Sequence, residues 1–307
     1  MKIAIIGRSE LLFESAELLK SAGHEIVCIV TAKAAPEYLK TELDFEGLAS
    51  SLRVPFAATT KISSVHEMLQ EAAAEVAVSV NYSGIIPKTV TDLFPLGVLN
   101  AHGGDLPRYR GNACQAWAII NGEERVGLCI HRMIGGELDN GDIIERDYLP
   151  IASSTNITEI WDWMQKRVPE LYVSAVNKLN EDKSYVLEVQ STEPLDALRC
   201  YPRKPVDSRI DWTKSSVDIL RLINASTSPY SGAYGIYKGE KIIILSAEIV
   251  DLKENYLAMP GQIARIDEAG ACVVITGQGE LKIKELSMKD RSLVPSEVIK
   301  SLRDRLE

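Results

Sequence analysis

The chain has 307 residues, of which 46% are hydrophobic and 25% charged, proportions typical of a globular protein. Its formal net charge of −9 excludes the strongly basic composition of a general nucleic-acid-binding protein. The length predicts two domains, because one hydrophobic core rarely grows beyond about 250–300 residues.

The first predicted elements are a strand, a helix and a second strand. Residues 2–7 form a continuous apolar run closed by a glycine, which is typical of a buried parallel strand. A helix is expected from Glu10 to Gly23, followed by a strand over 24–31. The connecting residues 7–12 lack the GxGxxG pattern of a dinucleotide-binding loop, so a nicotinamide-dependent dehydrogenase is not expected. Arg8 and Ser9 in this loop are instead candidates for contacting an anionic substrate group, with a structural role as the alternative.

The next segments continue the alternation of strands and helices. Strands are predicted over 54–58 and 75–80, with a helix over 63–73 between them. The second of these strands leads into residues 81–87, a strand-to-helix turn whose final proline suits the start of a helix over 89–94.

An amide and an imidazole follow the next predicted strand. The apolar run 96–99 gives way to Asn100-Ala101-His102 and then to a turn rich in glycine and proline. In an extended segment residues i and i+2 point to the same side. We therefore expect Asn100 and His102 to face one pocket at the carboxyl end of a strand, where α/β sheets bind their ligands.

A second loop supplies a carboxylate. After an alternating strand over 126–133, two glycines precede the turn Asp139-Asn140-Gly141-Asp142. On this strand His131 is expected to be a packed or surface residue, with an approach to the site as the alternative. Singly, Asn100, His102 and Asp139 are ordinary turn residues. Together they suggest a reaction, because an amide and a protonated imidazole can donate hydrogen bonds to an oxyanion while a carboxylate orients the imidazole or accepts a proton. The pattern includes no nucleophilic Ser or Cys, so we predict direct acyl transfer to an amine.

The rest of the chain predicts a change of architecture. Helices are expected over 115–121 and 155–180, a strand over 147–151, and a proline-bearing connector between residues 190 and 205. A helix over 215–225 follows, and the short alternating strands after residue 236 are typical of a small β-barrel of the OB-like type.

The motifs resemble those of the folate-dependent, methionyl-tRNA formyltransferase-like family. The resemblance rests on residues 100–102, 106–111 and 138–142, with looser matches at 82–87, 210–212 and 229–234, and the chain departs from the family's Ser and Leu at Gly104 and Asp105. It covers nearly the whole chain. It implies an α/β fold with a Rossmann-like, mostly parallel sheet in a formyltransferase domain (1–190), a linker (191–208) and a smaller C-terminal OB-like β-barrel domain (209–307).

The resemblance also implies roles for individual residues. N10-formyltetrahydrofolate would be the formyl donor, Asn100 and His102 would stabilise the developing oxyanion, and Asp139 would hold His102 and help to remove the proton of the amine. No metal is implied, and no His, Cys and carboxylate residues have metal-binding spacing. The folate pocket would be formed by Tyr82, Gly84, Ile85, Ile86, Pro87, Asn140, Gly141 and Asp142.

The acceptor amine is predicted from what the chain lacks. Residues 32–51 contain two lysines against four acidic residues, whereas tRNA-directed members of the family carry a basic insertion there. The sequence therefore most resembles the sugar N-formyltransferases, which act on nucleotide-linked amino (dideoxy) sugars of lipopolysaccharide and other surface glycans. A methionyl-tRNA formyltransferase is the alternative, and a non-catalytic nucleotide-sugar-binding module a third interpretation. The residues expected to contact the sugar nucleotide are Arg8, Ser9, Tyr201, Arg203, Lys204 and Tyr230.

Cysteine usage and hydropathy predict the compartment. The five cysteines are scattered without a CxxC pair, which predicts reduced thiols. No run approaches the roughly 18 apolar residues of a membrane span, and the first residues lack a signal-peptide pattern. We expect a cytoplasmic protein with no membrane partner, and the resemblance to sugar-directed enzymes suggests a homodimer.

Overall fold

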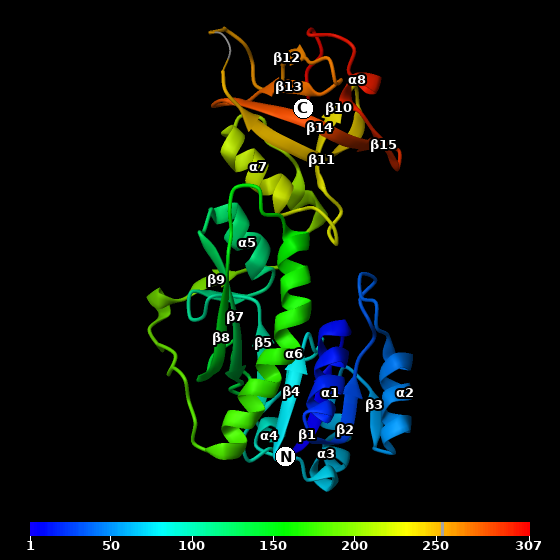
Figure 1. Ribbon diagram of the computed structural model, residues 1–307, viewed down its shortest axis with the longest axis vertical. Coiled ribbons are helices and arrows are strands. Elements are labelled where there is room, and N and C mark those ends of the chain that lie inside the picture. The colour runs from blue at the N-terminus through cyan, green and yellow to red at the C-terminus, as the bar shows by residue number, and fades with distance from the viewer. Residues whose placement is uncertain (253–254) are drawn as a thin grey trace. The chain divides into compact units, whose positions relative to one another are not determined.

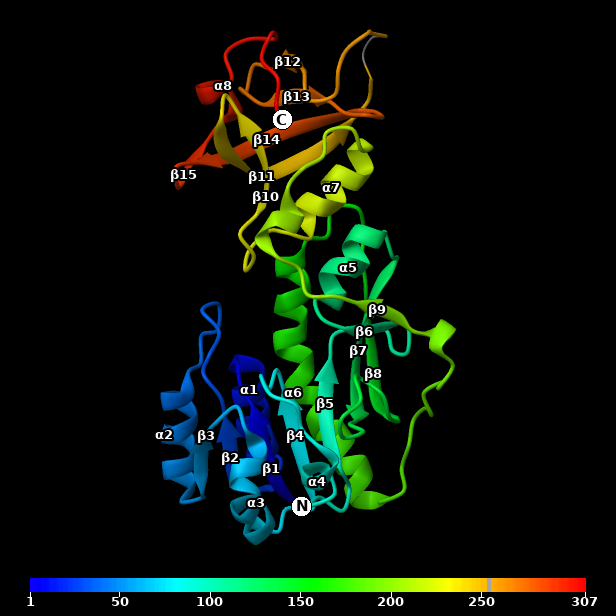
Figure 2. The same ribbon diagram turned by 180° about the vertical axis from the view of Figure 1, so that it is seen from behind.

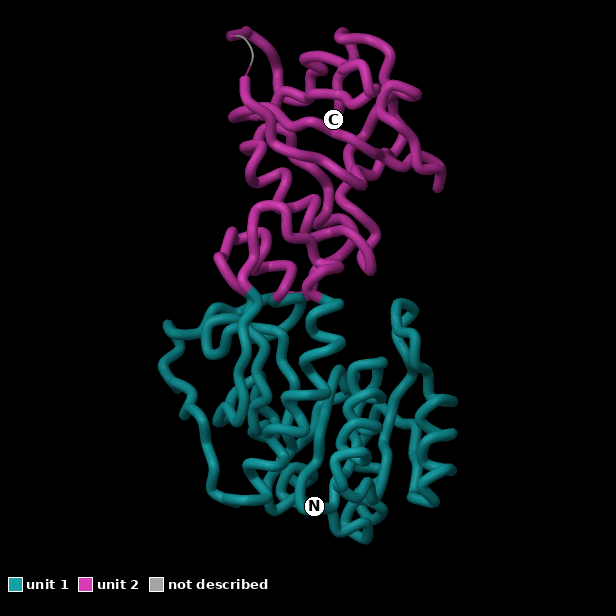
Figure 3. The backbone as a smooth tube through the Cα atoms, in the orientation of Figure 1, with its two compact units in different colours: residues 1–114, 126–149, 161–200 teal, residues 115–125, 150–160, 201–307 magenta. Residues whose placement is uncertain are grey.

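The computed structural model describes residues 1–252 and 255–307. These residues form two compact units, drawn in different colours in Figure 3. The first unit comprises residues 1–114, 126–149 and 161–200, and the second comprises 115–125, 150–160 and 201–307. None of the described helices is long and apolar enough to cross a membrane.

The first unit is built on a seven-stranded sheet in the order β3-β2-β1-β4-β5-β7-β8 (Figure 1). Pairs β1–β2, β1–β4, β2–β3 and β4–β5 are parallel, and β5–β7 is antiparallel, so the predicted mostly parallel α/β sheet is confirmed. The strands are β1 (Lys2–Gly7), β2 (Glu25–Thr31), β3 (Phe56–Ala58), β4 (Val76–Val80), β5 (Val98–His102), β7 (Arg125–Arg132) and β8 (Ile143–Pro150).

Both faces of this sheet are covered by helices (Figures 1 and 2), which is why its central strands read as continuous apolar runs. Ala4 and Ile6 of β1 pack in one cluster with Leu69 and Val90 of the helices on one face. On α6, the Tyr172 ring is fully buried and its hydroxyl donates to the Ser79 carbonyl of β4 at 2.6 Å. The helices are α1 (Glu10–Ser21), α2 (Glu42–Leu52), the 3₁₀ turn η1 (Ile62–Val65), α3 (His66–Ala72), α4 (Lys88–Thr91) and α6 (Ile157–Glu181).

The strand order reverses at the centre of the sheet. β1 lies between β2 and β4, so the loops that leave β1 and β4 diverge to opposite sides. Because β1, β4 and β5 are parallel, their carboxyl ends reach the same edge. This edge is where open α/β sheets bind ligands.

The second unit contains a six-stranded antiparallel sheet, which agrees with the alternating strands expected after residue 236. Its path is β10-β11-β14-β13-β12, with β15 paired to β14. Helix α7 (Ser216–Asn224) places Ile219 and Ile223 in a core that also contains Trp212. The remaining elements are α5 (Cys114–Asn121), β10 (Ala233–Tyr237), β11 (Glu240–Val250), β12 (Ile263–Ile266), β13 (Cys272–Ile275), β14 (Glu280–Met288), β15 (Arg291–Leu293) and α8 (Pro295–Val298).

Several elements were not predicted from the sequence, among them helix α2, a separate two-stranded sheet, and β15 and α8. Helix α2 forms in a stretch of mixed charge, where its capping box between Thr41 and Asp44 starts the helix. The segment expected as a connector contains β9 (Leu198–Cys200), which pairs in parallel with β6 (Tyr109–Gly111) in a separate two-stranded sheet. Two short 3₁₀ turns, η2 (Pro194–Asp196) and η3 (Pro205–Ser208), flank β9.

Candidate active site

Asn100 and His102 lie on β5 at the carboxyl edge of the first unit's sheet, where the spacing of two residues places them on one side. The pairing of β5 with β7 sets Asn100 directly opposite His131. The Asn100 Nδ2 lies 3.1 Å from His131 Nε2, and His131 Nδ1 lies 3.1 Å from the Asn140 carbonyl oxygen. A neutral His131 with its proton on Nδ1 satisfies both contacts, donating to Asn140 and accepting from Asn100.

His131 is 1% exposed, and this burial lowers its pKa to about 4. The imidazole is therefore neutral at pH 7 and remains an acceptor for the Asn100 amide. One of the two amide hydrogens of Asn100 is thus held, and the other remains for a ligand. The sequence placed His131 on the correct strand but favoured a packed or surface role over an approach to the site.

Asp139 comes from the loop between β7 and β8. Its backbone is left-handed, with φ +47°, and its Oδ2 accepts a hydrogen bond from the Gly111 N–H at 2.8 Å. The same oxygen lies 3.6 Å from His102 Nδ1, and Oδ1 lies 3.8 Å from His131 Nε2. Asn100, His102 and Asp139 therefore meet at one place, with His131 between the amide and the carboxylate.

The imidazole of His102 is held from its other side. Its Nε2 lies 2.6 Å from the carbonyl oxygen of Tyr109, and the residue is 7% exposed. Gly104 makes this contact sterically possible, because a Cβ there would lie 2.6 Å from His102 Nε2. Both ring nitrogens thus face oxygen atoms, Nε2 at hydrogen-bond distance from the Tyr109 carbonyl and Nδ1 at 3.6 Å from Asp139 Oδ2.

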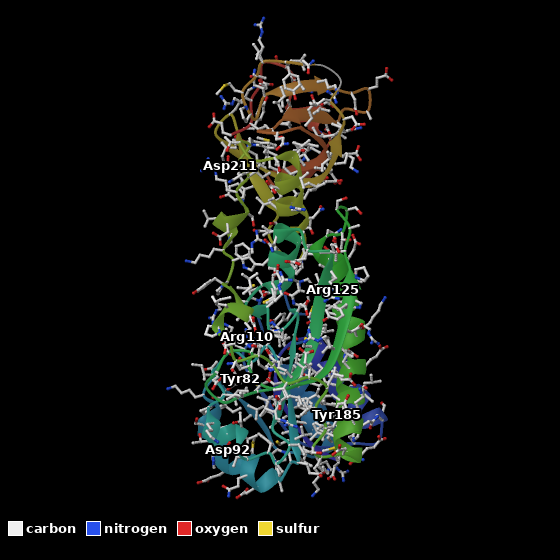
Figure 4. All side chains as sticks on the ribbon, turned by 90° about the vertical axis from the view of Figure 1, so that its left-hand side faces the viewer. Tyr82, Asp92, Arg110, Arg125, Tyr185 and Asp211 are labelled. Carbon is white, nitrogen blue, oxygen red and sulfur yellow. The ribbon has the colours of Figure 1, made fainter. Side chains whose placement is uncertain are left out.

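Gln190, which the sequence did not indicate, fixes the backbone of the Asp139 loop. Its Nε2 donates to the carbonyl oxygens of Asp139 at 3.1 Å and Gly141 at 2.6 Å. Its Oε1 accepts from Arg110 at 3.2 Å, and Arg110, labelled in Figure 4, also donates to the Ser191 carbonyl. The segment that follows α6 thereby joins β6 to the loop that carries the carboxylate.

The residues expected to line a folate pocket fall in two loops. After β4, the Tyr82 hydroxyl donates to the Thr59 carbonyl at 2.8 Å, and a Cβ at Gly84 would collide with backbone. Ile85 is 81% exposed, whereas Ile86 is 4% exposed and packs in the core, directly before Pro87 at the start of α4.

In the loop before β8, Asn140 donates to Glu137 through its side-chain amide at 2.7 Å. Gly141 has φ +102° and lies against the Arg132 carbonyl, so this position requires glycine. The Asp142 carbonyl accepts from the Arg132 N–H at 2.8 Å. The loop is therefore held mainly through its backbone.

Of the residues expected to contact the sugar nucleotide, two lie in the first unit. Arg8 donates to the carbonyl oxygens of Asn81 and Lys33, each at 2.8 Å, and so joins the ends of β1, β2 and β4. Ser9 is fully buried at the start of α1 with φ +86°, and its Oγ has no hydrogen-bond partner within residues 1–252 and 255–307.

The other four lie in the second unit. Arg203 donates to Ala225, Ser208 and Ser226, and burial lowers its pKa. Its guanidinium lies 6.0 Å from the centre of the Trp117 ring. The side chains that are exposed instead are Tyr201, Lys204 and Tyr230.

Comparison with known proteins gives matches along most of the chain. The family described as Formyl transferase matches residues 1–176, and Formyl transferase, C-terminal domain, matches 203–302. Methionyl-tRNA formyltransferase from Desulforamulus reducens is 29% identical over 294 residues, 94% of this chain and 90% of that protein.

Solved structures also match the fold. An N-formyltransferase from Helicobacter canadensis, in complex with folinic acid and dTDP-3-aminofucose, has a TM-score of 0.67 at 15% identity and covers 92% of this chain and 98% of its own. WlaRD, a sugar 3N-formyl transferase solved in the presence of dTDP and 5-N-formyl-THF, has a TM-score of 0.66 at 18% identity, covering 92% of this chain and 97% of its own. At these identities the structural matches show a shared fold.

Proposed function

The chain belongs to the formyl transferase family, and we propose that it transfers a formyl group from N10-formyltetrahydrofolate to the amine of a nucleotide-linked amino (dideoxy) sugar. Two structural neighbours were solved with folinic acid or 5-N-formyl-THF, which supports a formyl folate as the donor. The product would serve the synthesis of a surface glycan such as lipopolysaccharide.

The residues around the site fit such a donor. The loop after β4 presents the exposed apolar side chain of Ile85, and the loop before β8 is held in place through its backbone at Gly141 and Asp142. An exposed apolar side chain on one loop and an ordered polar backbone on the other suit a flat heterocycle with a polar edge. Bound between these loops, the donor supplies the formyl carbon.

Three side chains would carry the transfer. Asn100 offers the amide hydrogen that His131 does not hold, and His102 offers Nδ1, so both donate toward the formyl oxygen as it gains negative charge. Asp139, 3.6 Å from His102 Nδ1, orients the ring and accepts the proton that the attacking amine loses. Contributions of this kind are commonly worth about 10²–10⁴-fold each.

The short segment between β2 and α2 carries the choice of acceptor. It holds Lys33 and Lys40, and Lys40 is paired with Asp44 at 3.4 Å and lies over the Phe13 ring. A cation already paired within the chain contributes little to gripping a polyanion such as tRNA. Arg8, and the unpaired hydroxyl of Ser9 at the start of α1, suit a small anionic group such as a phosphate of a sugar nucleotide.

Methionyl-tRNA formylation is the second candidate. It is favoured by the name of the Desulforamulus reducens relative, which aligns along 94% of this chain. An acidic protein can still carry a local basic surface, and a complex with tRNA would weaken steeply as salt is raised.

The deciding experiment offers both acceptors side by side. Nucleotide-linked 3-amino and 4-amino dideoxy sugars and methionyl initiator tRNA are incubated with N10-formyltetrahydrofolate and the wild type, Asn100→Ala or Asn180→Ala. Asn180 is an exposed residue of α6 and serves as the matched control. We expect formylation of an amino sugar that is lost in Asn100→Ala and kept in Asn180→Ala. Efficient formylation of the tRNA with no turnover of the sugars would instead establish the second candidate.

A further inference from the structure

The two positions where this chain departs from the family pattern, Gly104 and Asp105, are explained by an arginine on β8. We propose that Asp105 and Arg146 are positioning residues that hold the imidazole of His102 through the carbonyl group of Tyr109. The inference rests on the proposed role of His102 in formyl transfer.

The first step is a nearly buried ion pair. Arg146 NH1 donates to Asp105 Oδ1 at 2.6 Å, and the side chains are 10% and 17% exposed. Arg146 NH2 donates to the Leu106 carbonyl at 2.8 Å and to Glu188 at 2.9 Å, while the Tyr148 hydroxyl donates to Asp105 Oδ1 at 3.1 Å. A guanidinium that binds a carboxylate and the adjacent carbonyl at once fixes both in one geometry.

The second step leads from this pair to the imidazole. The Asp105 carbonyl accepts from the Tyr109 N–H at 3.2 Å, and the Tyr109 carbonyl oxygen lies 2.6 Å from His102 Nε2. The Leu106 N–H donates to the Gly104 carbonyl at 3.0 Å, which closes the turn. Arg146 therefore holds residues 105 and 106, and these place the Tyr109 carbonyl oxygen that accepts the hydrogen bond from His102 Nε2.

The third step explains why both positions differ together. A side chain at Gly104 would begin 2.6 Å from His102 Nε2 and collide with the Tyr109 carbonyl, so the family's serine cannot stand here without moving the ring. With glycine at 104, that position supplies no side chain to order the turn. The turn is ordered instead by the side chain of Asp105, which is bound to Arg146 on β8.

A second aspartate–arginine pair provides a matched control, with its aspartate on β8 and its arginine on α6. Arg167 pairs with Asp147 at 2.7 Å, but these side chains are 37% and 32% exposed and bind no part of the turn at residues 104–109. Asp147 also accepts a hydrogen bond from the Tyr148 N–H at 2.8 Å, which an amide oxygen can keep. Asp147→Asn therefore weakens an aspartate–arginine pair close in sequence to Arg146 and leaves the Asp105–Arg146 pair in place.

The experiment compares Asp105→Asn, Arg146→Lys and Asp147→Asn with the wild type. The readouts are the ¹⁵N resonances of the His102 ring in the substrate-free protein, the pH–rate profile, and kcat and KM for formyl transfer. We expect Asp105→Asn to shift the His102 resonances and to lower kcat about ten- to hundredfold, as small misplacements of catalytic groups do, with KM within about twofold. Arg146→Lys keeps the positive charge but loses the guanidinium that binds Asp105 and the Leu106 carbonyl at once, so we expect shifted His102 resonances and a lower kcat here too. Asp147→Asn should leave every readout unchanged.

The two proposals fail separately. If no amine is formylated, the ring resonances still test whether Asp105 and Arg146 position His102. Folded Asp105→Asn and Arg146→Lys proteins with wild-type His102 resonances would overturn the positioning role, as would an equal effect of Asp147→Asn. Should Asp105→Asn fail to fold, Arg146→Lys alone tests the positioning role, because the lysine keeps a positive charge beside Asp105.

Discussion

Replacement of His131 by glutamine should change how stability depends on pH. Burial lowers the pKa of His131 from 6.5 to about 4, so the folded state keeps this ring neutral while the unfolded chain binds a proton below about pH 6.5. The unfolded state then carries more protons, and stability is lost as the pH falls from 6.5 toward 4. For these two pKa values the linkage relation gives a loss of about 2 kcal/mol between about pH 7.5 and pH 5.

Glutamine cannot take up this proton, so the loss should be absent from His131→Gln. The free energy of unfolding is measured by urea titration at about pH 7.5 and pH 5 for the wild type, His131→Gln and His66→Gln. His66 is the first residue of α3, outside the candidate site, and its replacement controls for the loss of a histidine. Between these two pH values, the free energy of unfolding of the wild type and of His66→Gln should fall by about 2 kcal/mol more than that of His131→Gln. Equal losses in all three proteins would refute a buried neutral His131.

Three further substitutions test the site and the core. Asp139→Asn should lower kcat by about 10²–10⁴-fold in a formyl-transfer assay, because the amide accepts no proton; an undiminished rate would remove this carboxylate from the reaction. Gly104→Ala should lower kcat by about ten- to hundredfold, since the new methyl group would start 2.6 Å from His102 Nε2, and unchanged kinetics would show that the turn yields without moving the ring. Tyr172→Phe should cost about 1–2 kcal/mol in urea unfolding with kcat unaltered, because a β4 carbonyl loses its 2.6 Å donor, and a wild-type midpoint would contradict that role.

The sequence predicted the parts of the site that depend on local periodicity. Asn100 and His102 face one side because β5 is extended, and any strand would place residues two apart in this way. Local periodicity could not predict that His131 lies beside Asn100, because this contact depends on the register between β5 and β7. A slip of one residue would turn His131 to the other face of the sheet, and nothing within residues 125–132 alone specifies that register.

The same limit applies to the segment after α6. Prolines and polar residues around 190–205 predict a connector, and composition carries no sign that Leu198–Cys200 pairs with β6. Three-residue strands are too short to show a periodic pattern. The role of Gln190 cannot be predicted for the related reason that a glutamine in a polar connector is ordinary until its partners are known.

The placement of Asp139 shows how far the site depends on contacts distant in sequence. The carboxylate is fixed by an N–H group 28 residues away at Gly111, and its backbone carbonyl by an amide 51 residues away at Gln190. A left-handed φ of +47° is unfavourable for a residue with a side chain, so these contacts hold a conformation that the turn alone would populate weakly. A chain cut after α6 would keep Asn100, His102 and Asp139 in its sequence, yet it would lack the amide that orders the Asp139 loop. The connector is therefore part of what orders the loop that carries the Asp139 carboxylate.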